Sequence, residues 1–178
     1  MVLSKFNMTE HKNLLLNNQL CFALYAATNS IIRYYRVYLK DIGITYPQYL
    51  VLLVLWEHES LSIKEIAKIL KLDSPTITPI VQKLEKINIV KRERNKDDER
   101  VVFVSLTKKG INLETEVAEI QNKVACNTHL KTKEFNELKK ILNTLTETMV
   151  IKENKLDTLL GKKVKTNRSV NFTTSKKD

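Results

Sequence analysis

The sequence predicts a mainly α-helical protein with one small β-hairpin. Apolar residues recur every three or four positions along most of the chain, which is the spacing of amphipathic helices. Only three Gly and three Pro occur in 178 residues, too few for a loop-rich β-fold or a Gly-rich nucleotide-binding fold. One segment, Val101–Leu106, is instead rich in the β-branched residues that strands favour. A chain of this length can bury one core, but hardly two large domains.

The balance of charge favours a polyanionic partner. Thirty Lys and Arg against twenty Asp and Glu leave a net charge of +10, which suits nucleic acid or an anionic membrane surface. The longest apolar stretch, from Tyr49 to Trp56, has about eight residues where a membrane span needs about twenty. The N-terminus carries no secretory signal and the two cysteines lie far apart, so we expect a cytosolic protein without a disulfide framework.

Two helices are predicted in the first third of the chain. Apolar residues three or four positions apart predict a long amphipathic helix from Leu14 to Leu39. Thr45 is the predicted N-cap of a second helix, with Pro47 near its first helical position, where a missing N–H costs nothing. This second helix is expected to extend to about His58.

Two short helices joined by a tight turn follow. Ser62 opens a helix that extends to Leu70 and has its apolar residues on one face. After a three-residue break, Ser74 is the predicted N-cap of the next helix, with Pro75 at the first helical position. This helix is expected to end at about Ile87.

A hairpin and two more helices complete the prediction. Ile89 to Glu93 and Val101–Leu106 are the predicted strands, joined by a charged tip from Arg94 to Arg100. Thr107 then caps a long amphipathic helix, and Thr132 caps the last helix.

This order of elements, two short helices, a tight turn between them and then a hairpin, is typical of a winged helix-turn-helix. In such a unit the second short helix enters the major groove of DNA. If its apolar residues face the core, its outward side chains carry hydroxyl, amide and cationic groups that suit base edges and phosphates. An ordinary solvated helix face is the alternative. The outward residues are Ser74, Thr76, Thr78, Gln82, Lys83 and Lys86.

The predicted hairpin tip has no net charge, because four cations are balanced by four acids from Arg92 to Arg100. Charge alone therefore does not make the tip a DNA clamp. Asp98 can instead orient Arg100 for insertion into a minor groove, whose negative potential attracts Arg. We expect Arg94, Asp98 and Arg100 at the DNA; an ordinary salt-bridged tip is the alternative.

The segment from Leu61 to Gly110 resembles the MarR family of winged-helix regulators. Asp98-Glu99-Arg100, followed by a strand and then Leu106-Thr107-Lys108-Lys109-Gly110, matches the wing motif of that family. NQLCFALYA around Cys21 and ITYPQYLVLLVLWEHE from Ile44 are similar to the organic hydroperoxide resistance regulators within the family. The resemblance covers roughly Asn18 to Leu113.

This resemblance implies a homodimeric repressor that binds a palindromic operator in double-stranded DNA. The reduced protein would bind the operator, and oxidation of Cys21 by an organic hydroperoxide would release it. The implied organisation is an N-terminal dimerisation helix over 1–45, a winged helix-turn-helix DNA-binding domain over 46–110, and C-terminal dimerisation helices over 111–160. A basic tail of low apolar content, 161–178, is predicted to be disordered.

A sensing thiol must form a thiolate, yet no cation lies near Cys21 on its own helix face, where Tyr25 is a neighbour. Phenol hydroxyls can stabilise the anion instead, and the resemblance carries two of them onto Tyr35 and Tyr46. Tyr35 lies 14 residues along the same predicted helix, about 21 Å away, so only a second subunit can bring it to the thiol. An antiparallel partner helix crossing near Thr28 would form two equivalent sites.

Cys126 departs from the one-cysteine form of these regulators and resembles the second cysteine of their two-cysteine form. It could convert a sulfenic acid at Cys21 into a disulfide, which requires Cα atoms within about 7 Å. Structural roles are the alternatives: Cys21 as a small buried hydrophobe among core tyrosines, and Cys126 as an ordinary helical cysteine.

Three other functions are compatible with the sequence. One is a MarR-like repressor that responds to a small apolar or phenolic ligand, with Cys21 incidental. Another is a thiol peroxidase, but no CxxC pair, Gly-rich phosphate loop or catalytic base is present, and His11, His58 and His129 form no metal cluster. The third is a basic architectural protein without operator preference. We therefore expect no enzymatic activity, no cofactor and no metal ion.

Overall fold

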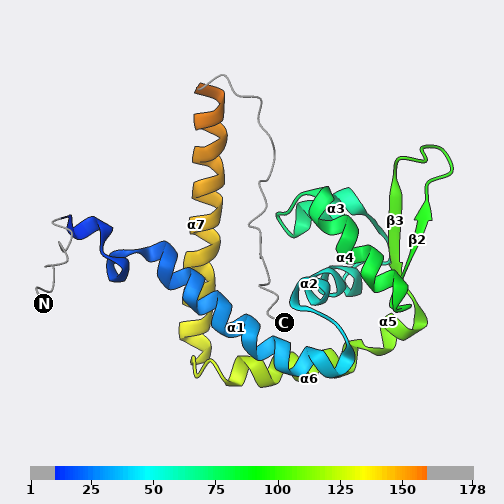
Figure 1. Ribbon diagram of the computed structural model, residues 1–178, viewed down its shortest axis with the longest axis horizontal. Helices are drawn as coiled ribbons and strands as arrows, with labels where there is room; N and C mark the ends of the chain where they lie inside the picture. Colours follow the sequence, from blue (N-terminus) through cyan, green and yellow to red (C-terminus); the bar gives the residue numbers. More distant parts are fainter. Residues whose placement is uncertain (1–10, 160–178) are drawn as a thin grey trace, which may run out of the picture.

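The computed structural model describes residues 11–159, which form seven α-helices and one small sheet at one edge of the molecule (Figure 1). A compact unit of three helices and the sheet lies at one end of the molecule. A long arm, made from the first helix and the two last ones, lies at the other end. The mainly helical fold with a hairpin is confirmed. The predicted basic tail, 161–178, lies outside the described residues.

The first helix begins six residues later than predicted. Two short 3-10 turns, Lys12–Leu14 and Leu16–Asn18, precede helix α1, Leu20–Ile42. The side-chain amides of Asn18 and Gln19 donate to backbone carbonyls upstream, and such bonds compete with the helical ladder. Cys21 is therefore the second residue of α1 rather than a residue in its interior.

Helix α2, Tyr46–Trp56, is the centre of the core. Gly43 ends α1 in the left-handed conformation, with φ of 78°. Thr45 is the N-cap as predicted, and its backbone N–H donates to Gln48 Oε1 at 2.7 Å in a capping box. The helix ends at Trp56 instead of near His58. Its apolar residues face several neighbours at once; the buried ones are Tyr49, Val51, Leu52, Val54 and Leu55.

The two predicted short helices are confirmed as α3, Ile63–Ile69, and α4, Ser74–Lys86. Ser62 caps α3 as predicted. The N-cap of α4 is Asp73 rather than Ser74, because the Asp73 carboxylate accepts from the backbone N–H of Thr76 at 2.8 Å. A carboxylate at this place satisfies an unpaired N–H and also complements the positive end of the helix.

The hairpin is confirmed and belongs to a three-stranded antiparallel sheet. Strands β2, Val90–Arg94, and β3, Val102–Leu106, pair with Arg92 opposite Val104. Strand β1, Leu61–Ser62, pairs with the other edge of β3, so the strand order is β1-β3-β2. The sequence did not indicate β1, because two residues carry no alternating pattern.

The helix predicted after Thr107 is two helices, α5, Lys108–Asn112, and α6, Glu114–Cys126. Thr107 caps α5 as expected, accepting from the backbone N–H of Gly110. The ladder breaks because the indole N–H of Trp56 donates to the carbonyl oxygen of Gly110 at 3.1 Å. In a continuous helix that carbonyl would accept from the backbone four residues on.

The last helix, α7, Thr132–Leu159, stands away from the unit formed by α2, α3, α4 and the sheet (Figure 1). Its predicted cap is wrong by one residue: the backbone N–H of Lys131 donates to Glu134 Oε2, so Lys131 precedes the first turn. A single chain leaves many apolar side chains of α1 and α7 in solvent, which is typical of a surface that another chain covers. The exposed ones include Leu20, Phe22, Tyr25, Tyr34, Val37, Phe135, Leu138, Ile141 and Met149.

Two further features of the described residues bear on function. Their buried apolar side chains form a core shared by α1, α2, α3, α4, the sheet and α6. None of the described helices has the length and apolar character that crossing a membrane requires.

Replacing Gly110 by Ala should destabilise the protein by about 1–3 kcal/mol. A Cβ at this position would press into the backbone carbonyl of Ile89, which cannot retreat without moving strand β2. Urea unfolding at a fixed protein concentration measures the loss. Lys108→Ala, on the exposed face of the same helix, is the matched control. Equal stability of both variants would show that the Ile89 carbonyl is free to move.

Candidate redox and DNA-binding sites

Helix α4 presents the predicted DNA-contacting residues unevenly. Ile77, Val81 and Leu84 are fully buried, so the opposite face of the helix is turned to solvent. The three residues of the C-terminal half, Gln82, Lys83 and Lys86, are exposed. Ser74, Thr76 and Thr78 are half-buried.

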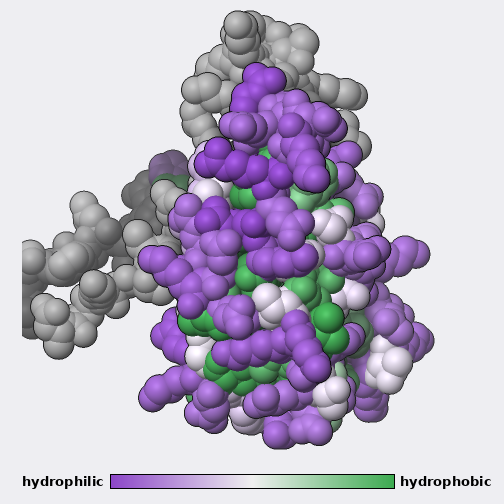
Figure 2. Space-filling model, turned by 90° about the vertical axis from the view of Figure 1, so that its right-hand side faces the viewer, coloured by the Kyte–Doolittle hydropathy of each residue, from purple (hydrophilic) through white to green (hydrophobic). Residues whose placement is uncertain are grey.

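The hydroxyl of Thr78 donates to the carbonyl oxygen of Ser74 at 2.8 Å, so this donor is used within the helix. Pro75 and Pro79, which were not assigned to the site, are exposed on α4. Figure 2 views the side of the molecule that carries the winged unit and shows mainly hydrophilic residues, with apolar ones between them. The net positive charge of the chain and the polar C-terminal half of α4 therefore both suit contact with a nucleic acid.

The hairpin tip holds Arg100 as expected. Its Nε donates to Asp98 Oδ1 at 3.0 Å and its Nη2 to Asp98 Oδ2 at 3.3 Å, while its backbone N–H also donates to Oδ1. The hydrogen bonds from Arg100 lower the pKa of the Asp98 carboxyl. The Arg100 side chain is 91% exposed, so it is oriented yet free to contact another molecule.

A second ion pair connects strand β2 of the hairpin to helix α4. Arg92 on β2 and Glu85 on α4 approach to 2.6 Å, and both side chains are partly buried. Arg92 is thereby committed to structure. Arg94, two residues along the strand, is exposed. Arg92 therefore stabilises the hairpin, whereas Arg94 and Arg100 remain available for contact with another molecule.

Three phenol rings form a cluster where α1 meets the start of α2. The ring centroids of Tyr35 lie 5.1 Å from Tyr46 and 4.9 Å from Tyr49, and those of Tyr46 and Tyr49 lie 5.7 Å apart. The hydroxyls of Tyr35 and Tyr49 share a hydrogen bond of 3.3 Å. The sequence prediction included Tyr35 and Tyr46 but not Tyr49, although the spacing of three between Tyr46 and Tyr49 places both on one helix face. Tyr25 is exposed on α1 and does not belong to this cluster.

Burial keeps these phenols protonated. It raises the pKa of Tyr35 well above the ordinary value, and the contact with Tyr49 raises it further. Burial also raises the pKa values of Tyr46 and Tyr49. The cluster therefore consists of neutral hydroxyls that can donate hydrogen bonds to an anion placed beside them.

Cys21 lies at the start of α1 and Cys126 at the end of α6, and both thiols are exposed. Cys21 lies in the first turn of α1, where unpaired backbone N–H groups and the positive end of the helix dipole favour negative charge. The spacing of apolar residues placed Cys21 inside a longer helix, so only side-chain cations were expected to act on its thiol. Cys126 is the last residue of α6, at a helix end that disfavours negative charge.

Within one chain the two thiols are far apart. Helices α1 and α6 lie side by side and antiparallel (Figure 1), with the Lys123 ammonium 5.9 Å from the Tyr38 ring centroid. Cys21 precedes Tyr38 by 17 residues, about 25 Å along α1, whereas Cys126 is less than one turn beyond Lys123. About 20 Å remains between the two, well beyond the reach of a disulfide. The phenol cluster is similarly out of reach of Cys21 in its own chain.

No group of three or more His, Cys, Asp or Glu side chains within residues 11–159 is arranged to hold a metal ion. The functional groups of this part of the chain are therefore the exposed thiols, the neutral phenols and the polar face of the winged unit.

Comparison with known proteins agrees with this arrangement. The profile of the family described as transcriptional regulator SarA/Rot matches residues 33–117. The chain is 40% identical over 134 residues to the organic hydroperoxide resistance transcriptional regulator of Bacillus subtilis, covering 75% of this chain and 91% of that protein. It is 37% identical over 137 residues to the HTH-type transcriptional regulator MgrA of Staphylococcus aureus, covering 76% and 91%.

Solved structures of AbfR, a protein of Staphylococcus epidermidis, show the same fold. Reduced AbfR bound to DNA superposes with a TM-score of 0.67 at 35% identity, covering 79% of this chain and 96% of that one. Disulfide-formed AbfR superposes with a TM-score of 0.56 at 36% identity, covering 78% and 92%.

A buried helical core, a recognition helix and an exposed wing define this chain as a winged-helix DNA-binding protein, a regulator of transcription rather than an enzyme. It belongs to the MarR-type family of winged-helix regulators, among which its relatives include an organic hydroperoxide resistance regulator.

Replacing Tyr49 by Phe should lower the pKa of the Tyr35 phenol while leaving it above the ordinary value, because the hydrogen bond is lost and the burial remains. Ultraviolet difference absorbance of tyrosinate during an alkaline titration measures this change. Tyr34→Phe removes an exposed phenol outside the cluster. It should leave unchanged the pH at which the Tyr35 phenol ionises. An unchanged step in the Tyr49 variant would contradict the role of the hydrogen bond.

The same raised pKa values make stability depend on pH. The folded chain holds these phenol protons at pH values where the unfolded chain releases them, so the unfolded state binds fewer protons above about pH 10. The stabilisation is therefore complete below about pH 10 and is lost as the pH rises through the folded-state pKa values. Denaturant midpoints measured on both sides of this pH should fall on the alkaline side.

Proposed function

We propose that this protein is a homodimeric repressor that binds a palindromic operator when its thiols are reduced and releases the DNA when an organic hydroperoxide oxidises Cys21. The observation that carries the proposal is the separation of Cys21 from the phenol cluster along one straight helix. The thiol is exposed at one end of α1, and the neutral hydroxyls that suit its anion are buried toward the other end. Two antiparallel copies of α1 bring each thiol to the phenols of the other chain.

The exposed apolar surface of α1 and α7 supports a dimer. Large apolar side chains follow both helices without burial in one chain, and a second copy removes them from water. A dimer also supplies two recognition helices, which a palindromic operator requires at a spacing of one DNA turn, about 34 Å. The dimer is proposed to act in the cytoplasm, where DNA is present and thiols are kept reduced.

The chemistry proposed at Cys21 is a two-electron oxidation. Its thiolate attacks one oxygen of the hydroperoxide, the O–O bond breaks, and a sulfenic acid forms while the alkoxide takes a proton and leaves as an alcohol. The hydroxyls of Tyr35 and Tyr46 from the partner subunit hydrogen-bond to the thiolate beforehand. The helix start at Leu20 provides the second source of anion stabilisation.

Cys126 is proposed to resolve the sulfenic acid. The sulfur of Cys126 attacks the Cys21 sulfur of the other chain and a disulfide forms; the thiol proton of Cys126 passes to the displaced hydroxyl, which leaves as water. The separation of about 20 Å within one chain favours a bond between subunits. Cys126 is the last residue of α6, and the first residue of α6 is connected through α5 to the wing. A disulfide that displaces the C-terminal end of α6 therefore also displaces the winged unit. The greater similarity to reduced, DNA-bound AbfR than to disulfide-formed AbfR supports the assignment of the described arrangement to the DNA-binding state.

At the DNA, α4 is proposed to enter the major groove with Gln82, Lys83 and Lys86, supported by the half-buried hydroxyls of Ser74, Thr76 and Thr78 near its start. Arg94 and Arg100 of the wing lie at the adjoining backbone and minor groove, with Asp98 orienting Arg100.

Cys21→Ser should keep operator affinity and lose the response to hydroperoxide. The experiment measures operator-fragment binding before and after one equivalent of cumene hydroperoxide, with non-reducing electrophoresis of the same samples. Reduced parent protein should bind, and oxidised parent should release the DNA and show a reducible dimer band. Release of the operator by the Ser variant on peroxide addition would rule out sensing at Cys21.

Cys126→Ser separates the two oxidation steps. We expect its Cys21 to be oxidised, so a sulfenic-acid probe labels the variant, but no reducible dimer band forms. If the band persists, the resolving thiol is not Cys126.

Arg100→Ala should weaken operator binding about tenfold, and Asp98→Asn should weaken it less, because Arg100 then stays charged but is oriented poorly. Fluorescence anisotropy with a labelled operator at constant ionic strength measures both. Lys40→Ala, which removes one positive charge from α1 outside the winged unit, controls for net charge. Equal loss in the Lys40 and Arg100 variants would show that the wing contributes only bulk charge.

A further inference from the structure

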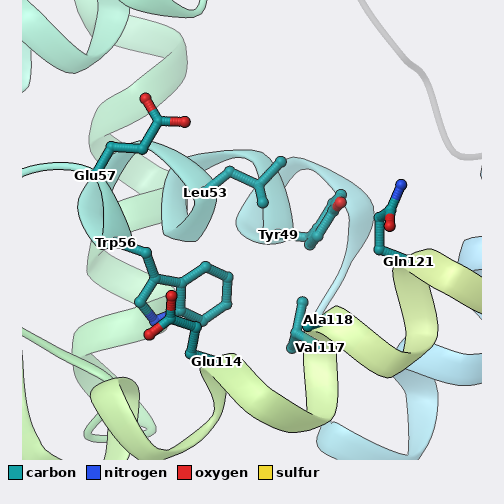
Figure 3. A pocket seen from close by; sticks show the side chains of 8 residues that line it. All are labelled: Tyr49, Leu53, Trp56, Glu57, Glu114, Val117, Ala118 and Gln121. Carbon is teal, nitrogen blue, oxygen red and sulfur yellow. The ribbon is translucent and has the colours of Figure 1, made fainter.

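The phenol cluster contains one hydroxyl more than the proposed sensor uses. Tyr35 and Tyr46 are the phenols assigned to the thiolate of the other chain, whereas Tyr49 has no assigned role. The Tyr49 side chain is buried, and its ring is stacked on that of Tyr35 with the two planes 30° apart. It also borders the space between α2 and α6, across from Val117 and Ala118 (Figure 3). Tyr49 therefore lies inside the chain, next to a phenol on the helix that is proposed to cross the partner.

The two assigned phenols differ in their hydrogen bonds. The Tyr46 hydroxyl makes no hydrogen bond with another residue between positions 11 and 159, so its proton is available to an outside acceptor. The Tyr35 hydroxyl lies 3.3 Å from the Tyr49 hydroxyl, and either oxygen can be the donor of this bond. A phenol has only one proton to donate. The direction of the bond therefore decides whether Tyr35 can donate to an anion.

Each direction of the bond suits a different state of a nearby thiol. When Tyr35 donates to Tyr49, the Tyr35 oxygen offers lone pairs, which suit the S–H of a neutral thiol. When Tyr49 donates to Tyr35, the Tyr35 proton is free for a thiolate. Hydrogen bonds in such a chain polarise one another, so a Tyr35 hydroxyl that accepts from Tyr49 is a stronger donor to the anion.

The surroundings of the cluster leave this task to hydrogen bonds. Among the described residues, only burial and the other phenols of the cluster shift the pKa values of Tyr35, Tyr46 and Tyr49, and no cation contributes. An anion placed beside these rings therefore gains no ammonium or guanidinium partner from the cluster. Donated hydroxyl protons are the stabilisation that the cluster can offer to it.

We infer that Tyr49 is a positioning residue of the redox site, which directs the Tyr35 proton toward the thiolate of Cys21 by donating a hydrogen bond to the Tyr35 oxygen. This inference rests on the proposed function, in which α1 of one chain brings Cys21 to the phenols of the other. Tyr49 does not contact the thiol and acts through Tyr35. Tyr46 acts on the thiolate independently, because its hydroxyl is bonded to neither of the other two. The bond between Tyr35 and Tyr49 reverses when the thiol loses its proton.

The rate at which iodoacetamide alkylates Cys21 tests this role, because the thiolate is the nucleophile. Full-length protein with Cys126→Ser has Cys21 as its single thiol, and mass spectrometry follows the rate against pH. Tyr49→Phe keeps the ring and removes the donor. The rate at neutral pH should fall about two- to fivefold, and the midpoint of the pH profile should move upward. An unchanged or faster rate overturns the inference, because Tyr49 would then only fill space or compete for the Tyr35 proton.

Double variants show whether Tyr49 acts through Tyr35. Tyr35→Phe should slow alkylation, and adding Tyr49→Phe to it should have no further effect, because the chain of two hydroxyls is already broken. In a Tyr46→Phe background the Tyr49 substitution should keep its full effect, because Tyr46 takes no part in the bond. A full further loss in the Tyr35→Phe background would mean that the Tyr49 substitution acts by packing, and would overturn the inference.

Tyr38→Phe is the matched control. Tyr38 is a half-buried phenol on α1, one turn beyond Tyr35, and its ring centroid lies 5.9 Å from the Lys123 ammonium, outside the cluster. Removing its hydroxyl should leave both the alkylation rate and the midpoint unchanged. Circular dichroism and gel filtration establish that each variant is folded and dimeric. Equal losses in the Tyr38 and Tyr49 variants would overturn the inference.

Tyr35→Phe by itself separates this inference from the proposed function. If it leaves the alkylation rate and the midpoint unchanged, the thiol does not meet the cluster, and both the proposed sensor and the role of Tyr49 are overturned. If Tyr35→Phe slows alkylation but Tyr49→Phe does not, only the role of Tyr49 is overturned. Losses in both variants that do not add support the inference.

Discussion

Gly110 is the point at which the DNA-binding unit meets the helical arm. Its N–H donates to Thr107, its carbonyl accepts from the indole of Trp56, and the absence of a side chain lets the carbonyl of Ile89 approach. Thr107 in turn donates from its backbone N–H to Ile89. Helix α2, helix α5, the end of β3 and the residue that precedes β2 therefore meet at Gly110. Closely packed groups of this kind do not deform continuously, so the proposed switch needs only a displacement of α6 to reach the winged unit.

The length of α1 separates the two halves of the proposed redox site. The start of the helix provides an exposed thiol and a favourable field for its anion, and the phenols lie more than three turns further on. Neither half can act on the other in the same chain. The dimer interface and the proposed sensor therefore occupy the same surface, and a change in one changes the other.

The local elements were predictable where a side chain caps a helix. Thr45, Ser62 and Thr107 are N-caps in the structure because their hydroxyls or their partners three residues on satisfy the first backbone N–H groups. Errors arose where groups compete. Asp73 rather than Ser74 caps α4, and Trp56, distant in sequence, breaks the helix after Thr107. Strand β1 exists only because β3 pairs with it.

The sequence by itself determined the order of the helices, the turn and the hairpin, and it supplied the thiols and two of the phenols of the candidate site through the residues that carry the resemblance. Periodicity and capping are local properties, so they can be identified without the fold. Only the tertiary structure decided that Cys21 lies in a first turn, that Tyr49 joins Tyr35 and Tyr46, and that Arg92 braces the wing while Arg100 stays available. Each of these depends on contacts or competing hydrogen bonds that no spacing along the chain encodes.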